Sequence, residues 1–247
     1  MSGMTAGSIP ESVLPAILPP LALSFDLDDT LWPIWPTIER AERLLHGWLQ
    51  THAPATAARF DAAGLRLLRN DIARRFPEWG HDLSRMRRES LREGLTIAGD
   101  DPALAEPAFD VFFDARQQVE LYADARDGLE RLARRFPLVA VTNGNSDLAR
   151  VGLDGLFRHS VSASKFGIGK PDARIFHAAC RHLDLRPHEV LHIGDDLALD
   201  VAGALDAGLE AVWMRRHEGA GDEVAPVLSR PYHTVANLTE LADALGC

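Results

Sequence analysis

The apolar positions of the chain follow two different patterns. Residues 21–27 form a short apolar run that predicts a buried strand, and this run ends among three aspartates. From about residue 32 to residue 122 the apolar residues recur at helical spacing instead, as in Ile38, Ala41 and Leu45. Proline and glycine breaks divide this second region into about four helices. The later three are expected at residues 60–76, 83–97 and 107–119.

From residue 125 onward, helical segments alternate with short apolar runs. We predict strands at residues 138–141, 160–163, 190–193, 211–214 and 233–235. Helices are expected at residues 127–135, 173–183, 197–207 and 238–245. This alternation is typical of a parallel sheet covered by helices on both faces, and strand 21–27 must join that sheet because it needs a ladder partner. The predicted fold class is therefore α/β, a doubly wound parallel sheet with an inserted α-helical region.

The chain is expected to comprise a leader, a core domain and an inserted domain. Residues 1–20 read as a flexible leader, because they contain four prolines and lack the basic start and compact apolar run of a secretory signal. Residues 21–31 and 123–247 form the predicted core domain, and residues 32–122 the predicted helical domain. No segment approaches the roughly 20 apolar residues that span a bilayer. We therefore expect a cytoplasmic protein.

Charge and composition narrow the class of partner. The net charge is -10 and the pI is about 5.4, which argues against a general affinity for nucleic acid or for an anionic membrane surface. Two cysteines provide neither a disulfide framework nor a zinc site. Hydrophobic residues make up 46% of the 247 residues, enough for a full core. A small molecule is the expected partner, and the oligomeric state stays open.

Polar residues follow the predicted strands at the points where the strands end. In open parallel α/β sheets, ligands bind outside the carboxyl ends of the strands. Aspartates follow the first strand, Thr-Asn-Gly-Asn at 142–145 follows the next, and Gly-Asp-Asp at 194–196 follows a later one. Lys170 precedes the helix expected at residues 173–183. These polar residues should therefore meet at one edge of the sheet.

The aspartates after the first strand suggest covalent chemistry on phosphorus. Asp26 could attack the phosphorus atom of an ester and form an aspartyl phosphate, while Asp28 protonates the leaving alcohol and then activates water. The alternative is a turn that caps the next helix. Carboxylates this close repel one another, so a hard, oxygen-seeking cation such as Mg2+ is expected beside them. Asp29 is expected to be a spectator in the turn.

Two later segments offer groups that bind phosphate. Thr142, Asn143 and Gly144 supply a hydroxyl and successive backbone N–H groups, although a simple turn explains the same residues. Only two of the 26 basic residues are lysines, and they lie close together at Lys165 and Lys170. Lys170, next to Pro171 and a helix start, is the better candidate to neutralise the nucleophile and the transferring phosphoryl group. A surface lysine is the alternative.

The aspartates after strand 190–193 are the remaining candidates. Asp195 is expected to bind the metal after the tight exit that Gly194 allows. Asp200 could hold Lys170 or a metal-bound water, and both Asp196 and Asp200 are candidates for supporting the metal ligands or for binding an auxiliary metal. Equally, Asp196 could cap the following helix and Asp200 could stabilise its first turn.

With these four segments in this order, the chain resembles the haloacid dehalogenase (HAD) superfamily. Residues 26–30 fit the first motif of that superfamily, Thr142 the second, Lys170 the third, and residues 194–200 the fourth. The helical insertion after the first motif resembles the C1 cap of subfamily I. The resemblance implies a Rossmann-like core, with Asp26 as nucleophile and metal ligand. It also implies that Asp28 is the acid/base, with its backbone carbonyl on Mg2+, and that Asp195 completes the protein ligands.

The second aspartate of the first motif separates two activities within that superfamily. Its dehalogenases replace this residue, because a departing halide needs no proton, whereas this chain retains Asp28. The resemblance therefore implies a phosphatase. More narrowly, segments 25–31, 81–85, 137–145 and 191–196 resemble bacterial phosphatases that act on flavin mononucleotide and on 5-amino-6-(5-phosphoribitylamino)uracil.

Four residues of the insertion are candidate substrate contacts. Trp32 and Trp35 could line the entrance or stack on a flat ring, or they could anchor the chain where the insertion begins. His81 and Arg85 could face an anionic substrate, or belong to a capped and solvated helix surface.

Three other functions stay open at this point. A sugar phosphomutase and a 2-haloacid dehalogenase share the expected fold. A receiver-like signalling module also combines aspartates, a threonine and a lysine on a parallel sheet, but the helical insertion and the close spacing of Asp26 and Asp28 disfavour it.

Overall fold

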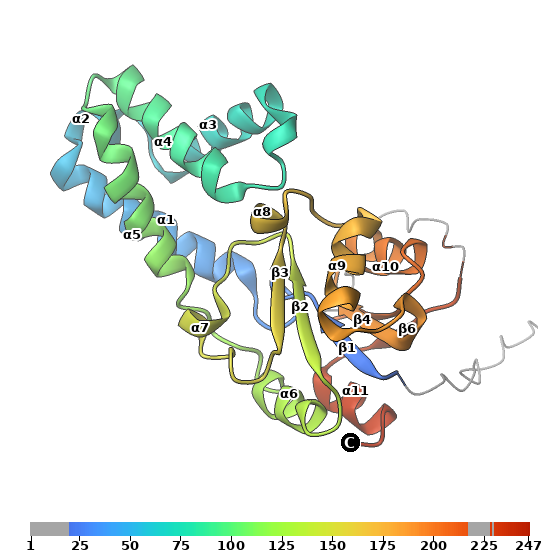
Figure 1. The fold of residues 1–247 in the computed structure, drawn as a ribbon. Coiled ribbons are helices and arrows are strands. Elements are labelled where there is room, and N and C mark those ends of the chain that lie inside the picture. Colours follow the sequence, from blue (N-terminus) through green and yellow to red (C-terminus); the bar gives the residue numbers. More distant parts are fainter. Residues whose placement is uncertain (1–19, 217–227, 229) are drawn as a thin grey trace, which may run out of the picture.

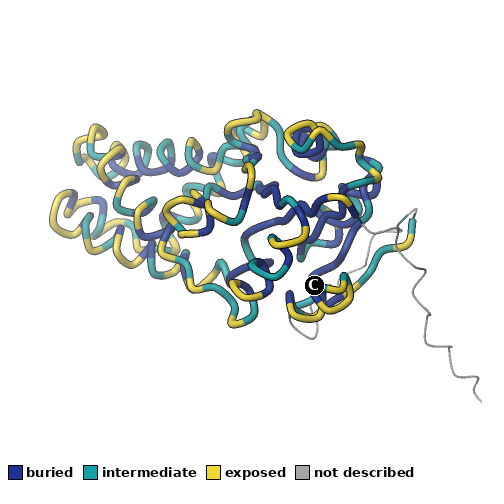
Figure 2. Tube along the Cα trace, turned by 60° about the horizontal axis from the view of Figure 1, so that its bottom comes forward, coloured by how far each residue is buried: buried dark blue, intermediate teal, exposed yellow. Residues whose placement is uncertain are grey.

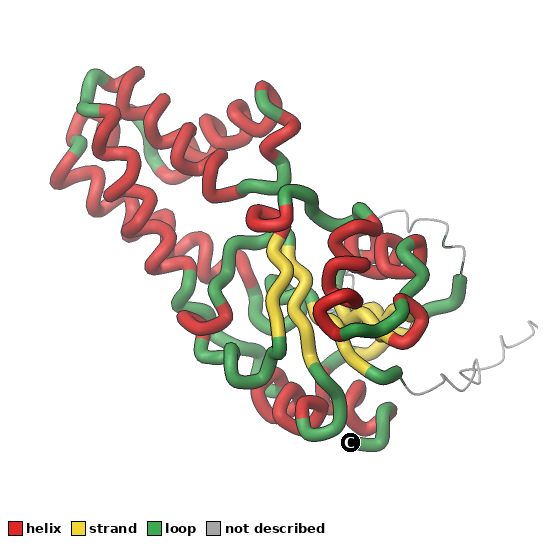
Figure 3. The backbone as a smooth tube through the Cα atoms, viewed as in Figure 1, coloured by secondary structure: helices red, strands yellow, loops and turns green. Residues whose placement is uncertain are grey.

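Six parallel strands form one sheet at the centre of the structure (Figures 1 and 3). The computed structural model describes residues 20–216, 228 and 230–247, so all but the last residue of the expected leader lies outside the described residues. The order of the strands is β3-β2-β1-β4-β5-β6, and every neighbouring pair is parallel. The strands are β1 (Ala22–Phe25), β2 (Leu138–Thr142), β3 (His159–Ser162), β4 (Val190–Gly194), β5 (Glu210–Met214) and β6 (His233–Val235). All six predicted strands are confirmed.

Alternating side chains of the central strands build two separate cores. Leu23 and Phe25 of β1 face a cluster shared with α6 (Ala125–Ala133) and α11 (Leu238–Ala244). Val139 and Val141 of β2 face the other way, into a cluster shared with α9 (Ala173–Leu183) and α10 (Gly203–Asp206). Figure 2 shows the buried residues concentrated between these layers. The doubly wound sheet is therefore confirmed, because apolar side chains leave both of its faces.

Five of the six α-helices between β1 and β2, α1 to α5, form the helical insertion, on one side of the sheet (Figure 1). Their own apolar cluster includes Leu45, Leu91 and Phe109. About four helices were expected, and the difference arises because Pro54 starts a new helix instead of a loop. Asp61 then caps the next one by accepting from the backbone N–H of Gly64 at 2.7 Å. The helices are α1 (Ile34–His52), α2 (Pro54–Arg59), α3 (Ala62–Arg75), α4 (Leu83–Ala98) and α5 (Ala105–Arg116).

The remaining differences from the predicted elements are short. The helix expected at 197–207 consists of a π-helical turn, Leu197–Ala202, followed by α10. Two helices of four residues each, α7 (Leu148–Val151) and α8 (Ala163–Phe166), were not predicted, since four residues show no helical periodicity. Short 3-10 helices cover Pro77–Trp79, Pro102–Leu104 and Pro187–Glu189. Within the described residues, no helix has the length and apolarity that crossing a membrane requires.

Candidate active site

A buried lysine connects two aspartates at the carboxyl ends of the strands. The Nζ of Lys170 donates to Oδ1 of Asp26 and, at 2.5 Å, to Oδ1 of Asp200. All three residues are less than a tenth exposed. A buried charge is tolerated only when it is paired and hydrogen-bonded, and here one ammonium faces two carboxylates. The group therefore retains negative charge that Lys170 does not balance.

The side chain of Asn143 holds the backbone of Lys170 in place. Its Nδ2 donates to the carbonyl of Lys170 at 2.9 Å, and its Oδ1 accepts from the N–H of Lys170 at 2.7 Å. A Cβ on Gly169 would lie 2.6 Å from that Oδ1, so only glycine fits beside it. The phosphate-binding role expected for Asn143 is thus corrected for its side chain, which is occupied in positioning the lysine.

A second chain of hydrogen bonds orients Asp200. The ring of His192 contacts Oδ1 of Asp200 through Nε2 at 3.1 Å, and its Nδ1 contacts Oγ of Ser24 at 2.8 Å. Burial raises the pKa of Asp200, but Lys170 and His192 outweigh this effect and lower it to about 2. A Cβ on Gly194 would lie 2.2 Å from Cγ of Asp200, so the strand exit needs glycine here. Asp200 is therefore an ionised partner of Lys170, and Ser24 and His192 are contributors that the sequence did not reveal.

Asp195 completes a group of carboxylates suited to a cation. Oxygens of Asp26, Asp195 and Asp200 lie within 4.8 Å of one another. Burial raises the pKa of Asp26 well above its usual value and, with the nearby Asp200, raises the pKa of Asp195 to about 7. These shifts arise because burial and the neighbouring carboxylates outweigh the charge of Lys170. Thr30 donates to Oδ1 of Asp195 at 2.9 Å, so Oδ2 of that residue stays open to a ligand.

This donor set fits Mg2+, which prefers carboxylate and carbonyl oxygens. Oδ1 of Asp200 already contacts Lys170 and His192, and its Oδ2 accepts from the N–H of Asp196 at 3.1 Å. Asp26 and Asp195 are therefore the side chains better placed to hold the ion directly.

The carboxylate of Asp28 is held by two residues on its other side. One nitrogen of Arg116, Nη2, donates to both oxygens of Asp28 at 2.7 Å, and Nε1 of Trp32 donates to Oδ1 at 2.8 Å. Arg116 is the last residue of α5 and is 2% exposed. Sequence reasoning missed it, since it lies 88 positions from Asp28 among many other arginines. Trp32 is fully buried, which favours the anchoring alternative over a place at the entrance, and its indole positions Asp28.

Gly144 allows Asp28 and Thr142 to approach each other. A Cβ at this position would lie 2.4 Å from Oδ2 of Asp28 and 3.1 Å from Oγ1 of Thr142. The N–H of Gly144 donates to the same Oγ1 at 2.9 Å. The hydroxyl of Thr142 at the end of β2 and the carboxylate of Asp28 after β1 thus lie close together beside Gly144, as their positions at the strand ends predicted.

Two aspartates next to the site have structural contacts. Oδ1 of Asp29 accepts from the N–H of Ile34 at the start of α1, at 2.9 Å. Oδ1 of Asp196 accepts from the N–H groups of Ala198 and Leu199, both at 2.8 Å, which is the helix-capping alternative. The group of carboxylates formed by Asp26, Asp195 and Asp200 does not include Asp196.

A cavity of about 260 Å³ lies beside Asp28 and is lined largely by residues of the insertion. Trp35 lines it and is 57% exposed, in keeping with a place at the entrance. His81 and Arg85 do not line it, and the guanidinium of Arg85 stacks 3.9 Å from the ring centroid of Trp79. For Arg85, this contact favours the alternative of a helix-surface residue.

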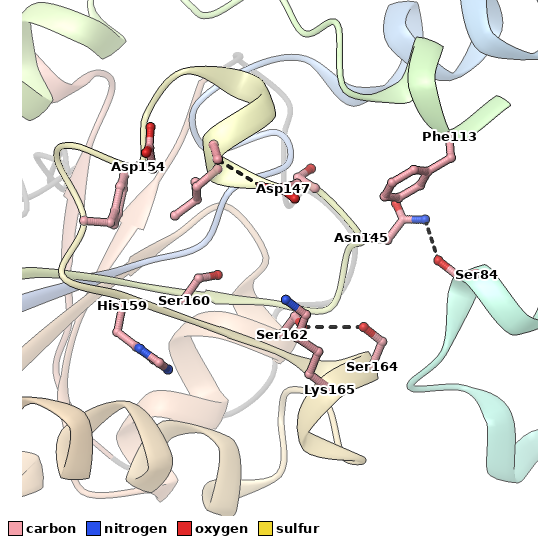
Figure 4. Close-up of a pocket in the computed structure, with 14 residues that line it drawn as sticks. Ser84, Phe113, Asn145, Asp147, Asp154, His159, Ser160, Ser162, Ser164 and Lys165 are labelled. Atoms are coloured by element: carbon pink, nitrogen blue, oxygen red, sulfur yellow. Dashed lines mark hydrogen bonds between the residues drawn. The ribbon is translucent and has the colours of Figure 1, made fainter. Parts of the chain in front are cut away.

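A second cavity, of about 430 Å³, lies between β3 and the insertion (Figure 4). Figure 4 shows Asn145 directed to Ser84 of α4, and its Nδ2 donates to Oγ of Ser84 at 3.1 Å. Asn145 lines both cavities, so this hydrogen bond stands between them. Lys165 lines this second cavity, whereas Lys170 does not.

The family model of the haloacid dehalogenase-like hydrolases matches residues 21–208. The chain belongs to this family. Membership makes the protein a hydrolase and leaves no support for the receiver-like module. It also agrees with the order of the four segments that meet at the sheet edge.

Similar proteins carry two different activities. The chain is 36% identical over 202 residues to the 5-amino-6-(5-phospho-D-ribitylamino)uracil phosphatase YigB of Escherichia coli K12, covering 80% of this chain and 84% of that one. It is 37% identical over 136 residues to the phosphoserine phosphatase of Thermus thermophilus, covering 53% and 55%. A solved structure of a 2-haloacid dehalogenase from Pseudomonas syringae pv. tomato DC3000 is 35% identical, with a TM-score of 0.82 over 91% of this chain and 97% of that one.

Removing the buried ammonium should destabilise the fold. Lys170→Met leaves Asp26 and Asp200 buried without their cation, so we expect the free energy of unfolding in metal-free buffer to fall by about 3–5 kcal/mol. Denaturant titration measures this change. The matched control is Lys165→Met, which changes the other lysine, an exposed one, and should stay within about 0.5 kcal/mol of the parent. Equal stability of the two variants would contradict the ion-pair account.

Proposed function

We propose that the protein is a Mg2+-dependent phosphomonoesterase that hydrolyses a small-molecule phosphate ester through an aspartyl phosphate on Asp26. One observation carries the proposal: a second carboxylate, Asp28, is positioned by Arg116 and Trp32 two residues from the nucleophile. Its oxygen shares the space beside Gly144 with the hydroxyl of Thr142. An ester needs such a proton donor, because an alkoxide is a poor leaving group.

In the first half of the reaction, a carboxylate oxygen of Asp26 attacks phosphorus and the bond to the leaving oxygen breaks. Asp28 donates a proton to that oxygen, so the product leaves as an alcohol. In the second half, Asp28 takes a proton from water, the water oxygen attacks phosphorus, and the carboxylate of Asp26 is released together with phosphate. Lys170 and the hydroxyl of Thr142 stabilise the phosphoryl oxygens throughout.

The metal ion would be held by Asp26, Asp195 and the backbone carbonyl of Asp28. When bound, Mg2+ supplies positive charge that offsets the charge of the phosphoryl group and of the carboxylates. The excess of acidic groups around Lys170 supports this assignment.

The helical insertion acts as the cap of this enzyme, and residues 21–31 with 123–247 form its catalytic core. The cap would exclude water during phosphoryl transfer and select the leaving group. Two contacts between the insertion and the core support this role: Arg116 with Asp28, and Ser84 with Asn145. The enzyme would act in the cytoplasm on a soluble small molecule. Flavin mononucleotide and the uracil phosphate named for the Escherichia coli relative are the first esters to assay.

Dehalogenation is the second candidate, favoured by the similarity to the Pseudomonas syringae structure. A departing halide is a stable anion, so that reaction gives Asp28 nothing to protonate. Chloride release from 2-chloropropionate without phosphate release from any ester would establish this alternative. A sugar phosphomutase would retain the phosphoryl group, so steady phosphate release from model esters would count against it.

Phosphate release should require Asp26 and Mg2+. We expect Asp26→Asn to lower kcat by roughly 10⁴-fold or more, the scale of losing a nucleophile. Chelation by EDTA should abolish release by the parent, and Mg2+ should restore it. The matched control is Asp29→Asn, because asparagine tolerates the positive φ of 58° and its side-chain oxygen can still accept from Ile34. Undiminished release by Asp26→Asn would exclude Asp26 as nucleophile.

The loss caused by Asp28→Asn should depend on the leaving group. Alkyl phosphates need a proton on the departing oxygen, whereas p-nitrophenolate leaves readily without one. We expect the first half of the reaction to slow by about 10²- to 10⁴-fold for an alkyl phosphate, and far less for p-nitrophenyl phosphate. Rapid-quench measurement of the first turnover tests this. An equal loss on both esters would show that Asp28 does not act as the acid.

A further inference from the structure

The cavity beside Asp28 is lined by three guanidinium groups from three helices. Arg69 comes from α3, Arg87 from α4 and Arg116 from α5. Among the described residues that line the cavity, Asp28 is the one acidic side chain. The insertion therefore places an excess of positive charge around the space that adjoins the proposed acid.

Arg116 has a buried donor without an acceptor. Its Nη2 is occupied by Asp28, whereas Nη1 is inaccessible to solvent and has no hydrogen-bond partner among the described residues. A buried polar group that lacks a partner costs stability, so such groups in a folded protein need an explanation. Asp28 therefore satisfies only one of the two terminal nitrogens of Arg116.

Arg69 and Arg87, the other two arginines of the cavity, have fewer carboxylate partners than positive charges around them. Glu42 pairs with Arg66 at 2.5 Å and lies 3.6 Å from Arg87, and it is 4% exposed. Arg69 has no carboxylate within ion-pair distance in the described part of the chain, and its Nη2 donates to the neutral side chain of Asn70. Burial and the neighbouring Arg69 lower the pKa of Arg87 to about 10, because the shared Glu42 does not offset these two effects.

The reacting phosphate does not account for this charge. Asp26, Thr142 and Lys170, which would hold that phosphate, do not line the cavity, whereas Asp28 does. Since Asp28 would protonate the leaving oxygen, a group in the cavity lies on the leaving-group side of the ester.

We infer that the cavity binds an oxyanion carried by the leaving group of the substrate, either a carboxylate or a second phosphate. The inference rests on the proposed phosphatase function and narrows its substrate class. Guanidinium groups bind both oxyanions through paired N–H donors. The cavity has a volume of about 260 Å³, so a compact leaving group fits inside. A larger one would extend past the exposed ring of Trp35.

Matched esters test the charge preference. 3-Phosphoglycerate and glycerol 3-phosphate differ only in a carboxylate that replaces a hydroxymethyl group, and fructose 1,6-bisphosphate carries a second phosphate that fructose 6-phosphate lacks. We expect kcat/KM to be roughly 10- to 100-fold higher for the charged member of at least one pair, the range of a charge-assisted hydrogen bond. The pair that shows the preference identifies the oxyanion.

Arg69→Gln should erase this preference, because it removes a guanidinium that has no ion pair to lose. The substitution should lower kcat/KM for the ester with the additional oxyanion by the full 10- to 100-fold preference. It should leave kcat/KM for the ester without that oxyanion within about twofold of the parent value. Arg69→Lys should restore part of the preference. The matched control, Arg74→Gln, changes an arginine of the same helix that is 78% exposed and does not line the cavity. Thermal unfolding of each variant verifies its folding.

Calorimetry on the inactive Asp26→Asn protein separates binding from turnover. The affinity of this protein for 3-phosphoglycerate or fructose 1,6-bisphosphate should fall when Arg69→Gln is added. It should stay unchanged when Arg74→Gln is added instead. The inference is overturned if neither charged ester is preferred, or if Arg69→Gln weakens both members of a pair equally. The inference is also overturned if the protein prefers the uracil phosphate, whose leaving group carries no oxyanion, and if Arg69→Gln does not change that preference. In that case the phosphatase proposal stands. Absence of phosphate release from every ester defeats the phosphatase proposal, and calorimetry still decides whether the cavity binds oxyanions.

Discussion

The buried ammonium of Lys170 is the charge on which the rest of the site depends. Asp26 follows β1, and Asp200 lies in the π-helical turn that follows the adjacent strand β4. Their carboxylates would repel each other without a cation between them. Lys170 bridges them, Asn143 fixes its backbone, and His192 fixes Asp200. One ammonium still leaves negative charge unbalanced, and Asp195 adds to it. The same arrangement that holds the strand ends together therefore creates the demand for a divalent cation.

The core and the insertion contribute different parts of the proposed chemistry. The core provides the nucleophile, the metal ligands and the phosphate contacts, all at the carboxyl ends of its strands. The insertion provides Arg116, which holds the acid, and two further arginines around the adjacent cavity. Arg116 has two roles, since it positions Asp28 and also lines the cavity. Reaction type and substrate choice are thus set by different segments that meet at one carboxylate.

Much of this could be predicted from sequence because strand ends are local signals. An apolar run followed by aspartates locates Asp26 and Asp195, and parallel topology brings them to the same edge. Lys170 stood out because lysine is rare in this chain. The contacts of Arg116, Ser24 and His192 could not be predicted, since they depend on side-chain directions across distant segments. In a chain with this many arginines, composition does not distinguish a buried guanidinium from a solvated one.

The side-chain directions of the two tryptophans after the first strand could not be predicted from sequence either, although these residues are close in the chain. Both stand next to prolines in one segment, yet Trp32 is buried against Asp28 whereas Trp35 is exposed beside the cavity. Their number and spacing are visible in the sequence, but the turn that separates their directions is not. Asp196 is similar, because its capping contacts appear only once the following helix has a defined start.

The covalent intermediate on Asp26 can be trapped and located. The protein would be mixed with a hydrolysable phosphate ester and Mg2+, quenched with acid during turnover, digested, and analysed by peptide mass spectrometry. The account predicts a phosphoryl group on Asp26, absent when Mg2+ is withheld and lost at alkaline pH, as expected for an acyl phosphate. A phosphoryl group on any other residue, or steady phosphate release with no adduct on Asp26, would contradict it.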